Sequence, residues 1–98
     1  MPSYLFQLEL PPMTEEMLSV IPKHREHINS LFADGKLLSY SVSSHSNMIW
    51  CVVECDNERA AMDMILKLPL YQYFTDIACH PLLFHNTQAA ALPGLSLN

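Results

Sequence analysis

This chain of 98 residues is short of glycine and of basic side chains. Its two glycines, Gly35 and Gly94, exclude a glycine-rich loop that cradles phosphate groups. Five Lys and Arg residues stand against ten Asp and Glu, and the formal net charge is −5. Because nucleic acids and anionic membranes bind clusters of basic side chains, we expect neither as a partner.

Long apolar runs and paired cysteines are also missing. No apolar segment approaches the ~20 residues of a membrane span, and residues 1–5 lack the basic start of a signal peptide. The three cysteines include no C-x-x-C motif, and Cys51 and Cys55 are expected about 13 Å apart along one strand. We therefore expect reduced cysteines that act as small core residues, and a cytoplasmic location.

What the chain has in excess is apolar surface. Half of its residues are hydrophobic and only 15% are charged, although a chain of this length buries a limited fraction of its surface. We expect one domain over residues 1–85, followed by a tail or arm over residues 86–98. The excess of apolar residues favours a second copy of the chain as partner, as a homodimer or a larger homo-oligomer.

The pattern of apolar residues predicts four strands and two helices. The strands are expected at residues 4–10, 37–43, 48–55 and 74–84. Thr14 is expected to cap the first helix and Gly35 to end it, while Pro22 either kinks it or begins a new helix. Asp56 or Asn57 caps the second helix, which Pro69 ends. The order βαββαβ is typical of an α+β, ferredoxin-like fold with a four-stranded antiparallel sheet.

The third predicted strand is apolar on both faces. Ile49 and Cys51 fall on one face, whereas Trp50 and Val52 fall on the other. The helices can cover only one face of the sheet, so the face with Trp50 needs another cover. The sheet of a second subunit would supply it, which predicts a dimer.

His24 lies inside the apolar stripe of the first predicted helix. On a helical wheel Val20, Ile21, Ile28 and Leu31 all fall within about 60° of it, and His27 lies at the edge of the stripe. One interpretation is a core histidine bonded to a carbonyl or to a strand hydroxyl. The other is a general base or acid in a pocket, because the histidine pKa is close to working pH. The hydroxyls available on the second strand are those of Ser39, Tyr40 and Ser41, with Tyr40 on the face opposite the two serines.

Aromatic and polar side chains elsewhere are candidates for the lining of such a pocket. The segment from Pro69 to Phe74 ends a helix and turns back to the sheet, and its rings either wall a pocket or seal the helix end. The candidate substrate-binding residues are Tyr4, Phe6, Ser39, Asn47, Trp50, Tyr71 and Tyr73. Asn47 is also an ordinary residue for a β-turn.

The histidines also allow a metal site as an alternative. His24 and His27 are spaced so that they could share one ion, with a third ligand from His45, His80 or a carboxylate. No motif with metal-ligand spacing supports this arrangement, so we predict no metal.

Several short motifs together resemble those of the muconolactone isomerase family. The residues that carry the resemblance are Gly35-Lys36, Asn47, Glu54, Leu68-Pro69-Leu70-Tyr71, Tyr73, Asp76-Ile77 and Pro81-Leu82. The match extends to about His85. A wider similarity to the YCII-related group rests on His24, which lies eleven residues before Gly35 as the helix histidine of that group does.

The resemblance implies a dimeric α+β barrel whose namesake enzyme shifts a double bond in an unsaturated lactone of catechol breakdown without a cofactor. Muconolactone isomerases have a glutamate where this chain has His24, so the resemblance implies a different proton-transfer residue. The partner aspartate of the YCII-related group has no counterpart in residues 43–47. We predict a cofactor-free enzyme for proton transfer and double-bond isomerisation in aromatic compound catabolism, with His24 and His27 as catalytic residues. The alternative is a non-catalytic domain for ligand binding or assembly.

Overall fold

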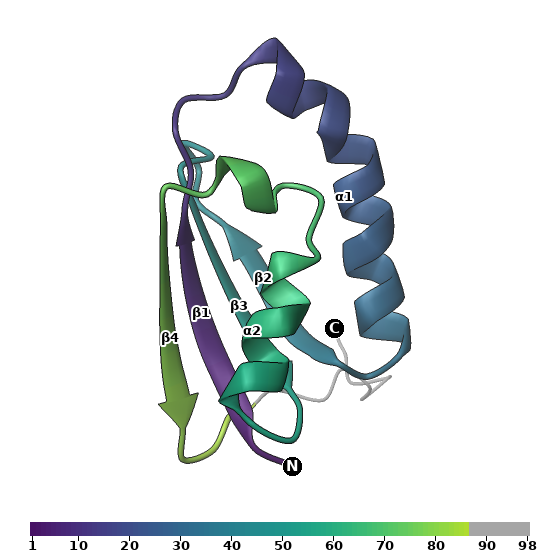
Figure 1. The fold of residues 1–98 in the computed structure, drawn as a ribbon, viewed down its shortest axis with the longest axis vertical. Helices are drawn as coiled ribbons and strands as arrows, with labels where there is room; N and C mark the ends of the chain where they lie inside the picture. The colour runs from purple at the N-terminus through teal and green to yellow at the C-terminus, as the bar shows by residue number, and fades with distance from the viewer. Residues whose placement is uncertain (87–98) are drawn as a thin grey trace, which may run out of the picture.

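The computed structural model describes residues 1–86, which form a four-stranded antiparallel sheet with two helices packed on one face (Figure 1). The elements are β1 (Ser3–Glu9), α1 (Glu15–Ala33), β2 (Leu37–Val42), β3 (Met48–Glu54), α2 (Glu58–Leu66), the single-turn 3-10 helix η1 (Tyr71–Tyr73) and β4 (Asp76–Leu82). The strand order β2-β3-β1-β4 confirms the predicted ferredoxin-like fold. The predicted tail, apart from Asn86, lies outside the described residues.

Helix α1 positions His24, and its start follows from local chemistry. The Thr14 hydroxyl accepts a hydrogen bond from the Met17 amide at 3.2 Å, and two glutamates in the first turn suit the positive end of the helix. The helix continues through Pro22, so of the two alternatives expected at that residue the start of a new helix is excluded. Pro22 is tolerated because it is exposed, as is Leu18, whose carbonyl loses its amide partner and can bond to water instead.

Gly35 turns the chain from α1 into β2. Its φ of +73° is in the left-handed region. The Gly35 amide donates to the Phe32 carbonyl and the Lys36 amide donates to the Leu31 carbonyl, each at 3.0 Å. These two bonds form a Schellman motif, which satisfies carbonyls at the helix end. The next strand can therefore begin two residues later, at Leu37.

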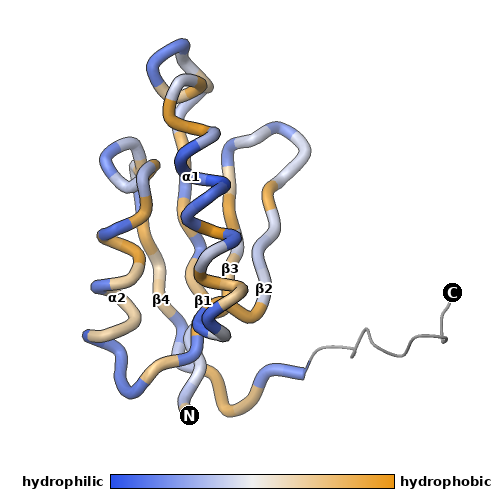
Figure 2. The backbone as a smooth tube through the Cα atoms, turned by 90° about the vertical axis from the view of Figure 1, so that its right-hand side faces the viewer, coloured by the Kyte–Doolittle hydropathy of each residue, from blue (hydrophilic) through white to orange (hydrophobic). Residues whose placement is uncertain are grey.

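The face of the sheet under the helices holds the core. Tyr4, Phe6 and Leu8 of β1 alternate toward the helices, and in the strand register Phe6 pairs with Cys51 of β3. Seen from the side, α1 and α2 both lie in front of the strands (Figure 2). Met17 and Ile28 of α1 and Ala61 and Ile65 of α2 complete this core.

The opposite face of the sheet is not covered by either helix. Leu5, Trp50, Val52 and Ala78 point to it, as their register partners show. Trp50 is 38% exposed, whereas Val52 between the neighbouring strands is only 2% exposed. This outer face combines apolar side chains at its centre with Glu9, Glu54 and Asp76 at its ends.

Strand β2 contains an irregularity that determines which side chains face α1. The register shifts between Leu37, which pairs with Val53, and Ser39, which pairs with Val52. The extra residue is Leu38, a β-bulge of the kind that re-aims the side chains that follow. As a result Leu37 and Tyr40 face the helices together, while Ser39 and Ser41 face the outer side.

The cysteines agree with the sequence-based expectation. All three are free thiols, Cys51 is buried in the core, and Cys55 and Cys79 pack against its edge. Burial raises the pKa of the Cys51 thiol to about 12, so the reactive thiolate is scarce at neutral pH. Among residues 1–86, no helix is both long enough and apolar enough to cross a bilayer.

Candidate functional site

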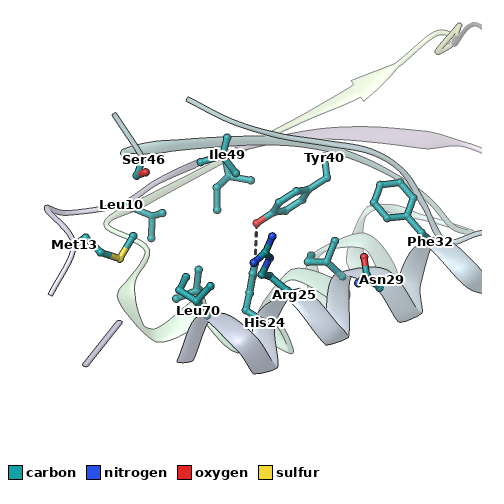
Figure 3. A pocket seen from close by; sticks show the side chains of 13 residues that line it. Leu10, Met13, His24, Arg25, Asn29, Phe32, Tyr40, Ser46, Ile49 and Leu70 are labelled. Atoms are coloured by element: carbon teal, nitrogen blue, oxygen red, sulfur yellow. Dashed lines mark hydrogen bonds between the residues drawn. The ribbon is translucent and has the colours of Figure 1, made fainter. Parts of the chain in front are cut away.

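A cavity of about 460 Å³ lies between α1 and the strands β2 and β3 (Figure 3). Its wall is mainly apolar, with side chains from α1, from both strands, from the segment before α1 and from Leu70 before η1. The apolar lining residues are Leu10, Met13, Ile21, Ile28, Phe32, Val42, Ile49 and Leu70. The polar ones are His24, Arg25, Asn29, Tyr40 and Ser46. A mostly apolar concave site with a few convergent polar groups is typical of small-molecule binding.

His24 and Tyr40 form the polar centre of the cavity. They point toward each other from α1 and β2, with 2.8 Å between His24 Nε2 and the Tyr40 hydroxyl (Figure 3). The rings are tilted by 49° with centroids 6.0 Å apart, so the contact is made by the polar atoms rather than by stacking. The helical wheel predicted that His24 faces the sheet, and the 2% exposure of its side chain confirms it.

The second nitrogen of His24 is buried and has no partner. Nδ1 makes no hydrogen bond within the described part of the chain. Burial lowers the pKa of His24 from 6.5 to about 4, and the nearby His27 adds a smaller effect in the same direction. The imidazole is therefore neutral at neutral pH. Burial likewise raises the pKa of Tyr40 well above its usual range, so its hydroxyl keeps its proton.

The remaining polar lining determines which charges the cavity accepts. Arg25 and Asn29 lie one turn apart on α1, and Ser46 lies in the hairpin between β2 and β3. Arg25 is the only charged side chain among the lining residues within the described chain, and no carboxylate accompanies it there. A neutral or anionic ligand fits this lining better than a cationic one.

His27 lies outside this cavity. It lines a separate shallow depression with Lys23, Glu26, Ser30 and Pro69. Its effect on His24 is electrostatic, as described for the pKa. Within residues 1–86 no three His, Cys, Asp or Glu side chains are grouped so that they could hold a metal ion.

Four of the predicted substrate-binding residues lie away from the cavity. Tyr4 and Phe6 are buried in the core on β1, where Phe6 has no exposed surface. Ser39, which pairs with Val52, and Trp50, which pairs with Ser41, lie on the outer face of the sheet. None of the four lines the cavity that contains His24.

The other three predicted substrate-binding residues have local structural roles. Asn47 closes the hairpin between β2 and β3, where its side-chain oxygen accepts a hydrogen bond from the Ser43 hydroxyl at 2.7 Å. Tyr71 packs edge-to-face on Phe74 with centroids 6.2 Å apart, and Tyr73 packs against the core. In this segment Leu70, rather than either tyrosine, lines the cavity.

The polar lining residues that sequence reasoning did not select are Tyr40, Arg25, Asn29 and Ser46. Arg25 and Asn29 both fall on one side of His24 on the helical wheel, so a wheel extended beyond the apolar stripe could have found them. Tyr40 was considered as a hydroxyl near the helix but was not selected, because alternation along β2 does not reveal the bulge at Leu38.

Solved structures with a similar fold include two enzymes whose names refer to small cyclic compounds. Muconolactone isomerase is 19% identical, with a TM-score of 0.67 over 91% of this chain and 95% of that one. The 5-chloro-2-hydroxyhydroquinone dehydrochlorinase TftG from Burkholderia phenoliruptrix AC1100, solved with 2,5-dihydroxybenzoquinone, is 10% identical, with a TM-score of 0.67 over 80% and 90%.

A third similar structure is an antibiotic biosynthesis monooxygenase. It is 17% identical, with a TM-score of 0.53 over 88% of this chain and 100% of that one. No protein-family model and no curated protein sequence matches the chain. At these identities the structural likeness shows that the chain has the α+β, ferredoxin-like fold of these proteins.

Proposed function

We propose that the chain is a cofactor-free enzyme that moves a proton within a small unsaturated lactone or a related intermediate of aromatic breakdown. The observation that carries the proposal is a neutral histidine paired with a tyrosine hydroxyl in a mostly apolar cavity. Two structures of the same fold bear the names of enzymes that act on such small cyclic compounds, which supports this substrate class.

The chemistry needs only a proton acceptor and a shielded cavity. A base removes the proton next to the carbon–carbon double bond, and the electron pair of the broken C–H bond becomes part of a dienolate. The protonated base then delivers a proton, which can exchange with solvent, to the other end of the dienolate, so that the double bond has moved and the composition of the molecule is unchanged. His24 is the proposed acceptor, and its neutral state at neutral pH leaves a lone pair available.

The low pKa of His24 in the empty cavity does not oppose this role. A dienolate in the cavity would place a negative charge beside the imidazole, which favours the protonated form. The positive charge of His24 is therefore stabilised when the intermediate forms, rather than before the substrate binds. An interaction that strengthens along the reaction is the kind that accelerates it.

The proposal is tested with two lactones in deuterated water. We expect the wild-type chain to move the double bond of muconolactone or α-angelica lactone and to incorporate solvent deuterium at the carbon that is reprotonated, as followed by NMR. Binding of both lactones without exchange or isomerisation would instead support the alternative, a domain that binds small apolar ligands. Neither binding nor exchange would contradict both functions for this substrate class.

We also infer that two copies of the chain pair through the outer face of the sheet. The apolar centre of that face, Leu5, Trp50 and Ala78, has no cover from the helices, and burying it gains free energy at about 25 cal/mol per Å². Such pairing corresponds to the dimeric barrel implied by the family resemblance. A reducing, cytoplasmic setting stays a prediction of the sequence.

Replacing Trp50 with glutamate should dissociate this dimer. We expect a dimer for the wild type and a monomer for Trp50→Glu in size-exclusion chromatography with light scattering at micromolar concentration. Leu66→Glu is the matched control, because Leu66 on α2 has a similar exposure, 43% against 38%, but lies on the helix side of the sheet. A monomeric wild type, or equal dissociation of both variants, would rule out this interface.

A further inference from the structure

We infer that the Tyr40 hydroxyl, and not the His24 imidazole, is the group that meets the substrate, and that His24 accepts the proton through Tyr40. The inference rests on the proposed function and specifies how the proton travels. It follows from the hydrogen-bonding capacity of the two side chains in the cavity (Figure 3).

His24 has no nitrogen free to reach a ligand. Each imidazole nitrogen makes one hydrogen bond, and the one at Nε2 is used by Tyr40 at 2.8 Å. The other nitrogen, Nδ1, is buried and has no accessible surface through which a ligand could approach it. A substrate in the cavity therefore meets the imidazole only after the bond to Tyr40 is broken.

Tyr40 keeps unused capacity on the same atom. A phenolic oxygen carries one proton and two lone pairs, and the bond to His24 occupies only one of these three positions. Tyr40 lines the cavity and its side chain is only half-buried. The oxygen can therefore contact a substrate atom while it remains bonded to His24.

These two observations define a proton relay through Tyr40 to His24 in which every bond that breaks is matched by a bond that forms. The substrate C–H bond breaks as its proton passes to the Tyr40 oxygen, while the original phenolic proton passes from that oxygen to His24 Nε2. The products are a dienolate and an imidazolium, with Tyr40 neutral throughout. In the second half the imidazolium returns its proton to the Tyr40 oxygen, which protonates the dienolate at its other end.

The relay has a further requirement, which is the tautomer of His24. Tyr40 must donate its O–H to Nε2, so that Nδ1 carries the imidazole proton. Its buried N–H then has no partner within residues 1–86, which disfavours the folded state. The opposite tautomer would leave Nε2 without a lone pair for the relay.

Kinetics of three variants test the relay on the same lactones. We expect Tyr40→Phe to lose about 10²–10⁴ in kcat, as His24→Gln does, because either change removes the single path of the proton. The double variant should lose no more than the worse single variant, since residues that act as a unit are not additive. Ser41→Ala is the control, because it removes the hydroxyl of the next residue on β2, which faces the outer side.

The outcomes separate the relay from the proposed function. An active Tyr40→Phe beside an inactive His24→Gln would overturn the relay and leave the function standing, because His24 would then act directly. An inactive wild type would overturn the function itself. Independently of any substrate, nitrogen NMR of the labelled imidazole should show the proton on Nδ1, and a proton on Nε2 would overturn the relay.

Discussion

Substituting glutamine for His24 is expected to lower kcat for lactone isomerisation by about 10²–10⁴, the usual contribution of a positioned acid or base. Glutamine approximates the size of histidine and can still bond to the Tyr40 hydroxyl, but its amide does not accept a proton at neutral pH. KM should change much less, because the apolar wall around the cavity remains. Steady-state kinetics with muconolactone or α-angelica lactone measure both quantities.

The matched control for this variant is His45→Gln. His45 is exposed in the hairpin between β2 and β3 and does not line the cavity. The two variants change the same chemical group, so a difference between them reflects location. Equal activity of His24→Gln and His45→Gln, with both proteins folded by circular dichroism, would remove His24 from the mechanism.

Acid should destabilise the folded chain through the same histidine. The pKa of His24 is lowered from 6.5 to about 4 on folding, first by burial and then by His27. Above 6.5 the imidazole is neutral in both states and contributes no pH dependence. Between 6.5 and about 4 the unfolded chain binds a proton that the folded chain does not, so stability falls as the pH falls. Below about 4 both states are protonated, and this group adds no further loss.

The size of this loss follows from the shift in pKa. Each unit corresponds to 1.36 kcal/mol, so the free energy of unfolding should decrease by about 3 kcal/mol across the window. Carboxylates titrate in the same range, which is why the measurement is a difference. Urea unfolding of the wild type and of His24→Gln should diverge as the pH falls through the window, and parallel profiles for the two proteins would contradict the lowered pKa.

The fold could be predicted because its signals are local and agree with one another. The cap at Thr14, the glycine at residue 35 and the proline at residue 69 each mark an element boundary by its own backbone chemistry. The last strand was predicted to start at Phe74 but starts at Asp76, because Tyr71 to Tyr73 form a turn of 3-10 helix first. The Phe74 amide donates to the Tyr71 carbonyl and so belongs to that turn.

The site could be predicted only in part, because it depends on contacts between distant segments. The helical period was sufficient to place His24 against the sheet, but not to identify what it meets there. Trp50 was already expected on the face of the sheet opposite Cys51. Selecting it as a substrate contact therefore required a site on the outer face, whereas the cavity lies on the helix side. The directions in which the rings of Tyr71 and Tyr73 point depend on the exact rotation of the short 3-10 turn that carries them, and residue types do not specify that rotation.

The bulge in β2 makes chain length, rather than residue identity, decide where the Tyr40 hydroxyl lies. A strand alternates with a period of two, so if β2 kept its length but lost the bulge, Leu38 would pair with Val52 and every later side chain of β2 would turn to the other face. That change would exchange a tyrosine for serines opposite His24 without changing a single lining side chain of α1. In homologous proteins that lack the bulge, the tyrosine must therefore lie one residue nearer to this glycine for the pair to form.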